Sequence, residues 1–116
     1  MQKSTITIEV GLDEKRVPES IQWKATDSTA EKPRDAKAFM VSFWDGADNA
    51  ALRMDLWTKE MRVDEMADFY YQTLMTMADS FDRATHQQEL VNKMKQFAHD
   101  FYKRFAELQE KENKIQ

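Results

Sequence analysis

The sequence contains no cysteine, only two glycines and two prolines, and no long apolar run. Without cysteine the chain has no disulfides, thiolate metal ligands or cysteine nucleophiles. The phosphate-binding loop, the dinucleotide-binding fingerprint and the GxSxG turn all need glycines at set positions in one short motif. Gly11 and Gly46 stand too far apart for any of them. These absences exclude several common classes of enzyme.

Long apolar segments are missing as well. A membrane-spanning helix needs about 20 consecutive apolar residues, and no segment approaches that length. The first ten residues alternate between polar and apolar types, unlike the apolar core of a secretory signal. We therefore expect a cytoplasmic protein without membrane insertion. The alternative is a short extracellular or periplasmic fragment stripped of its signal, which would have the same pattern.

Positive charge is scarce. The chain has 17 Lys and Arg against 21 Asp and Glu, and its formal net charge is -4. Non-specific nucleic-acid binding depends on clustered Lys and Arg that neutralise phosphates, so we expect no nucleic-acid partner. The 116 residues and the hydrophobic content of 41% are typical of one folded domain, which we place over residues 1–116.

The stretch from Phe39 to Thr58 predicts a β-hairpin whose turn is the acidic segment 45–49. Strand residues alternate between two faces, and one register aligns three apolar pairs, which we expect in the core. These pairs are Phe39 with Leu56, Val41 with Met54, and Phe43 with Leu52.

The opposite face of this hairpin is the best candidate for function. The same register sets Trp44 against Ala51, Ala38 against Trp57, Ser42 against Arg53 and Met40 against Asp55. Aromatic residues and arginine dominate the energetics of protein interfaces. We predict an interaction surface made of Trp44, Trp57, Met40, Arg53, Asp55 and Lys24. In the alternative interpretation, the loop 27–33 covers this face or the tryptophans lie over Lys and Arg stems.

Two further strands precede the hairpin. Residues 5–12 and 19–26 alternate polar and apolar types, and pairing Val10 with Ile21 and Ile8 with Trp23 aligns their apolar faces. Pro33 can instead begin a helix over residues 35–38, but the bulky residues that follow favour a strand from about Ala36.

After Thr58 the apolar period changes from 2 to 3.6 residues, which predicts two amphipathic helices separated near Thr85. The apolar stripes are Val63, Met66, Tyr70, Leu74, Met77 and Phe81, then Leu90, Met94, Phe97, Phe101, Phe105 and Leu108. We expect an α+β fold, a four-stranded antiparallel sheet of two hairpins followed by two long helices packed on one face. The sheet occupies about residues 3–58, the helices about residues 62–110, and the C-terminal tail frays. Helices that overhang the sheet predict a protein partner or a homo-oligomer.

Site chemistry is sparse. His86 and His99 fall about 140° apart around a helix, too far to share a metal. The segment 45–49 does not match a calcium loop, and Asp55, Asp64 and Glu65 suit a strand surface or a helix start. We predict no catalytic residue, no cofactor and no metal.

The segment from Leu52 to Met61, LRMDLWTKEM, followed by VDEM at residues 63–66, resembles the gliding motility protein GldC family of the Bacteroidetes. The similarity extends from Lys3 to about Phe105. The family pattern leads us to expect proline at position 62, where this chain has Arg62 instead.

The resemblance implies a non-enzymatic accessory protein of the gliding machinery, associated with type IX secretion and acting inside the cell. It transfers no binding residues. Two other functions stay open. Strands followed by two helices in an acidic chain resemble the export chaperone SecB, which suggests a holdase. A crevice between sheet and helices can also bind a small molecule.

Overall fold

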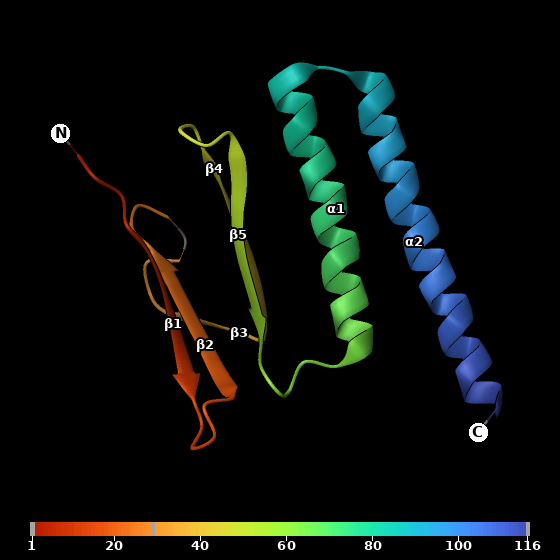
Figure 1. The fold of residues 1–116 in the computed structure, drawn as a ribbon, viewed down its shortest axis with the longest axis horizontal. Helices are drawn as coiled ribbons and strands as arrows, with labels where there is room; N and C mark the ends of the chain where they lie inside the picture. Colours follow the sequence, from red (N-terminus) through yellow and green to blue (C-terminus); the bar gives the residue numbers. More distant parts are fainter. Residues whose placement is uncertain (1, 29, 116) are drawn as a thin grey trace. The chain divides into compact units, whose positions relative to one another are not determined.

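The computed structural model describes residues 2–28 and 30–115, the side chains of residues 114 and 115 excepted. Five strands precede two helices (Figure 1). The chain divides into two compact units, Met1–Met61 and Arg62–Gln116, which are described separately. The elements are β1 (Ile6–Leu12), β2 (Pro18–Ala25), β3 (Arg34–Ala36), β4 (Ala38–Asp45), β5 (Ala50–Trp57), α1 (Val63–Thr85) and α2 (Gln88–Ile115).

The first unit contains two antiparallel sheets. β1, β2 and β3 form a three-stranded sheet in that order, and β4 pairs with β5 in a separate two-stranded sheet. The predicted pairs Val10 with Ile21 and Ile8 with Trp23 are confirmed. The prediction of α+β class is also confirmed, but that of a single four-stranded sheet is wrong. Strand β3 was missed because it is only three residues long.

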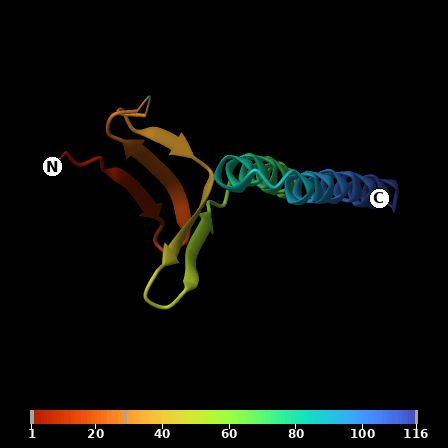
Figure 2. The ribbon, with the colours of Figure 1, turned by 90° about the horizontal axis from the view of Figure 1, so that it is seen from above.

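A bend at Lys37 produces the two sheets. The chain pairs with β2 through β3, turns at this single residue, and pairs with β5 through β4 (Figure 2). Thr58 holds the bend, because its backbone N–H (2.8 Å) and its Oγ1 (3.0 Å) both donate to the Lys37 carbonyl. Thr58 is only 3% exposed. The alternative helix over residues 35–38 is wrong, since the segment is extended on both sides of the bend.

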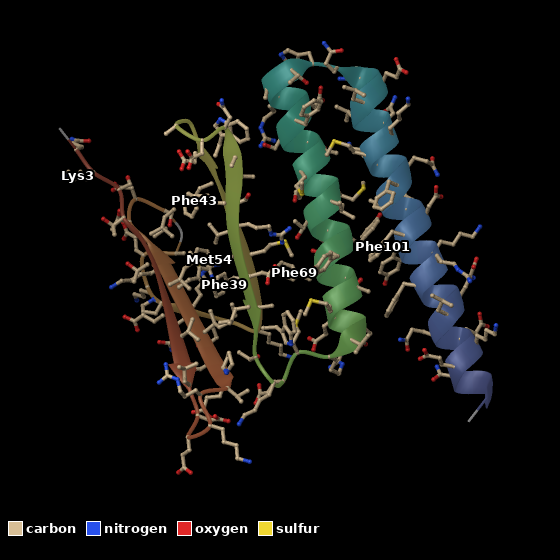
Figure 3. The ribbon with its side chains drawn as sticks, in the orientation of Figure 1. Lys3, Phe39, Phe43, Met54, Phe69 and Phe101 are labelled. Atoms are coloured by element: carbon tan, nitrogen blue, oxygen red, sulfur yellow. The ribbon has the colours of Figure 1, made fainter. Side chains whose placement is uncertain are left out.

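The register of the β4–β5 hairpin agrees with the prediction at every predicted pair. The burial does not: Phe43, Leu52 and Met54 are more than half exposed, whereas Phe39 and Leu56 are partly buried. Figure 1 shows the turn of the hairpin lying away from β1 and β2, which approach its open end. The half of the hairpin near the turn therefore has no facing sheet. Figure 3 shows that Phe43 and Met54, which belong to this half, still point to the side of β1 and β2.

The core of the first unit lies beside the bend. Ile21 on β2 and Ala30 in the following loop are each 2% exposed. Ala30 also accepts the N–H of Ala25 through its carbonyl at 2.8 Å, which ties the loop to the end of β2. The apolar interior is therefore small and local, and the expected core of three hairpin pairs is only partly formed.

The second unit is an antiparallel helical hairpin. The first helix starts where expected: Asp64 and Glu65 occupy its first turn, and Glu65 accepts the Arg62 N–H at 3.2 Å. It ends at Thr85, followed by His86 in a left-handed conformation. The predicted boundary near Thr85 is confirmed. The second helix runs to Ile115, beyond residue 110, where the apolar pattern ends.

Small residues form the contact between the two helices. Ala67 and Ala78 on α1, and Val91 and Ala98 on α2, are at most 5% exposed. Small side chains let two helices approach closely, and this contact row on α1 is offset from the predicted apolar stripe. Val63 and Met77 of that stripe are therefore exposed.

A row of polar contacts follows one edge of this hairpin. Tyr71 Oη and His99 Nδ1 lie 3.2 Å apart, Lys95 pairs with Asp79 at 3.0 Å, and Gln88 donates to Asp82 at 2.6 Å. A hydrogen bond with Asp68 raises the pKa of Tyr102 above its ordinary value. These contacts, which join α1 to α2 four times, are called the polar ladder below.

The turn between β1 and β2 is organised by Asp13. Its Oδ1 accepts the N–H groups of Lys15 (2.8 Å) and Val17 (2.9 Å), and its Oδ2 lies 3.0 Å from Lys59 Nζ. The Val17 hydrogen bond, followed by the Lys59 ammonium, lowers the pKa of Asp13 below its ordinary value. The carboxylate thus links the turn to the segment that follows β5.

We predict that Thr58→Val lowers the free energy of unfolding of the first unit by about 1 kcal/mol, because one buried hydrogen bond to the Lys37 carbonyl is lost. All three tryptophans precede residue 62, so urea unfolding followed by tryptophan fluorescence measures this unit. The control is Thr26→Val in the same unit, whose exposed hydroxyl accepts the Thr5 N–H. Equal effects of the two substitutions would contradict the role of Thr58.

We predict that Asp13→Asn destabilises the protein at neutral pH and that the difference from wild type shrinks in acid. Because the pKa of Asp13 is lower in the folded state, its contribution is complete above the unfolded-state pKa and disappears as pH falls through the folded-state pKa. Urea unfolding between pH 7 and pH 3 tests this, with the exposed neighbour Glu14→Gln as control. A difference that is constant across this range would argue against the role of Asp13.

Candidate interaction surface

Five of the six predicted surface residues lie on one face of the β4–β5 hairpin. Trp44 stands across from Ala51, and Trp57 across from Ala38. An alanine partner covers little of an indole, and the two tryptophans are 68% and 57% exposed. Neither tryptophan is therefore buried by loop 27–33 or by any other part of the first unit.

The two tryptophans lie near opposite ends of the hairpin. Ala38, the partner of Trp57, precedes Trp44 by six strand residues, so the tryptophans are about 20 Å apart along the strands. Arg53 and Asp55 lie between them and form an ion pair of 3.1 Å, with the partly buried Met40 across from Asp55. Because the ion pair is exposed, it contributes little to stability. We call these five residues the tryptophan face.

The structure places the sixth predicted residue, Lys24, on a different sheet. Lys24 lies on β2 across from Thr7 in the three-stranded sheet. With Gln22 and Glu9 it borders a small cavity of about 40 Å³. The sequence pattern gave no signal for this separation, because it contained no sign of the bend at Lys37.

One carboxylate of the acidic turn forms a hydrogen bond within the turn itself. Asp45 Oδ1 accepts the Ala47 N–H at 2.9 Å, the hydrogen bond of an Asx turn. His86 follows the last residue of α1, and His99 contacts Tyr71. Within residues 2–28 and 30–115, no group of three or more histidines and carboxylates is arranged to hold a metal ion.

In the same part of the chain, neither helix combines the length and apolarity needed to cross a membrane.

Sequence reasoning missed a second exposed surface. Phe43, Leu52 and Met54 lie on the hairpin face opposite the tryptophan face and are 54–59% exposed. We call them the inner apolar face. Strand length gave no signal for this surface, because β1 and β2 are about as long as β4 and β5. The exposure follows instead from the bend at Lys37, which the sequence pattern did not indicate.

Where the two sheets meet, the inner side of the unit has an apolar cavity of about 160 Å³. The lining residues are Ile6, Ile8, Ile21, Trp23, Ala36, Ala38 and Phe39. None carries a titratable group. The cavity therefore offers apolar contact but no acid, base or nucleophile.

Comparison with known proteins supplies the family. A family model described as gliding motility-associated protein GldC-like matches residues 18–107, which is most of the chain. No curated protein and no solved structure gave a significant match. The match includes β2 to β5, α1 and most of α2, and it confirms the resemblance drawn from residues 52–66. The chain therefore belongs to the GldC-like family of gliding motility-associated proteins.

Proposed function

We propose that this chain is a non-enzymatic accessory protein of the gliding machinery, associated with type IX secretion, that acts in the cytoplasm through protein contacts. Its tryptophan face is the docking surface for a partner in that machinery. The observation that carries the proposal is the exposure of Trp44 and Trp57 on either side of the Arg53–Asp55 ion pair.

The composition of the tryptophan face suits a protein partner. Tryptophan and arginine are enriched among the residues that dominate binding energy, and an aromatic side chain can bury roughly 150–250 Å². The ion pair between the two indoles adds polar specificity to such an interface. Because this pair is exposed, it costs little desolvation in the free protein.

The titratable groups support a structural role rather than catalysis. The Asp13 side chain raises the pKa of Lys59, and the Asp64 side chain raises the pKa of Arg62. These pairs hold a turn and the start of α1. Each perturbed pKa thus has a partner that explains it locally, as structural ion pairs commonly do.

We expect Trp44→Ala, Trp57→Ala and Arg53→Glu to abolish gliding and co-purification of partner proteins from the native cell. Phe43 offers a matched control, because it neighbours Trp44 on the same strand, lies on the opposite face and is similarly exposed, 59% against 68%. Phe43→Ala should leave gliding and co-purification intact. Folded variants of the tryptophan face that still glide and retain their partners would refute this surface.

The alternative function, a SecB-like cytosolic holdase for exported substrates, is favoured by the inner apolar face. Exposed apolar surface of this kind can bind unfolded chains. If the alternative holds, the protein suppresses aggregation of an unfolded substrate, and Phe43→Ser or Leu52→Ser weakens the effect while Trp44→Ala does not. Light scattering of an aggregating test protein measures this. A chain without such activity, or one impaired equally by Trp44→Ala, would exclude the inner face as a holdase site.

A further inference from the structure

The first helix carries two heptad rows, of which only one contacts α2. The contact row consists of Ala67, Tyr71, Leu74, Ala78 and Phe81. The other, which we call the second row, consists of Val63, Met66, Tyr70, Thr73, Met77, Ser80 and Ala84. Its members are separated alternately by three and four residues, the spacing by which helices pack side by side in coiled coils.

The second row is uncharged and largely exposed; only Met66 and Thr73 are partly buried. Val63 is 68% and Met77 50% exposed. The helix α1 has six charged residues, and none of them belongs to the row. These charged residues are Asp64, Glu65, Asp68, Asp79, Asp82 and Arg83. The water-facing side of a helix normally carries charged residues. A continuous row without charge therefore indicates a side that packs against another element.

The second helix extends this surface. At 100° per residue, the polar ladder falls on one side of the contact between α1 and α2, and the second row falls on the other. Leu90, Phe97 and Leu108 of α2 lie on the same side as the second row, and they are 43–60% exposed. The exposed Lys93 and Arg104 flank them, as charged residues flank the apolar centre of an interface.

The dimensions of this surface match a helix-pairing interface. The second row extends over 22 residues of α1, or about 33 Å, and three heptads are about the minimum for sustained pairing. Two adjacent helices are about 20 Å wide. The face of the hairpin that carries the second row therefore has an area of roughly 650 Å². A standard interface buries about 800 Å² on each partner.

The partner that this surface fits is a second copy. In a two-fold interface each residue faces a residue of the same surface. An antiparallel pairing that sets Tyr70 against Thr73 also sets Met66 against Met77 and Val63 against Ser80. It brings no like charges together within the row, because the row has none. We propose that two copies of this chain associate through the second row of α1 and the exposed apolar residues on the same side of α2, and that they form a four-helix bundle. The proposal does not depend on the tryptophan face.

Light scattering coupled to size-exclusion chromatography tests the proposal first. We expect twice the chain mass of 13.7 kDa for wild type. Tyr70→Glu should raise the dimer dissociation constant by about 100-fold or more, because it buries a charge without a partner. The exposed Ser80 gives a second variant, Ser80→Glu, that does not disturb the monomer. The matched control is Gln72→Glu, with the same charge on the same helix but off both rows.

A monomeric wild type at all accessible concentrations would overturn the proposal, as would an assembly that both row variants leave intact. The proposal would also be overturned if Gln72→Glu dissociated the dimer as strongly as Tyr70→Glu does. If wild type forms a larger assembly, the proposal requires that the row variants reduce its mass by half. Circular dichroism establishes that each variant keeps its helices.

Cross-linking locates the interface independently. Because the chain has no cysteine, a single engineered cysteine can react only with that of another copy. We expect Thr73→Cys, on the second row, to form dimers rapidly with a short bismaleimide. Gln72→Cys, one position away and off the row, should react at least about tenfold more slowly, because a coiled-coil contact excludes side chains outside its seam. Equal rates would place the contact elsewhere.

Discussion

The structure of the first unit depends on one acceptor, the carbonyl of Lys37. Thr58 donates to it through both its backbone and its hydroxyl, so the chain is held where it leaves one sheet and enters another. A strand that continued straight would have joined the two hairpins into one sheet. The bend instead directs β4 and β5 away from β1 and β2, and it concentrates burial around Ile21 and Thr58.

The functional proposals follow from surface that this arrangement leaves exposed. The hairpin has one face with two tryptophans and an ion pair, and an opposite face with Phe43, Leu52 and Met54. The helical hairpin has a separate, largely exposed row on α1. Exposed apolar patches of this extent on folded proteins mark sites of association. The family match to gliding motility-associated proteins names a setting in which such contacts would operate.

The predictions that succeeded rest on local chemistry. Alternation along β4 and β5 indicated which residues share a face, because a shift by one residue turns every side chain to the other face. The short turn between the strands selected among the registers that keep these faces and differ by two residues. The change of period after Thr58 located the helices, and polar residues near Thr85 marked their boundary. Assignments of burial were among those that failed. Phe43 and Val63 belong to apolar patterns, yet both are exposed, because a pattern identifies a face without identifying what covers it.

The sequence by itself determined which segments are strands and helices, how each hairpin is paired, and which residues share a face. These properties arise from side-chain periodicity and hydrogen bonding between neighbouring segments. Only the tertiary structure decided that the strands form two sheets, that Lys24 lies apart from the tryptophans, and that α1 uses one of its two apolar rows against α2. Those outcomes depend on a bend at one residue and on close packing between alanines, and neither leaves a periodic signal in the chain.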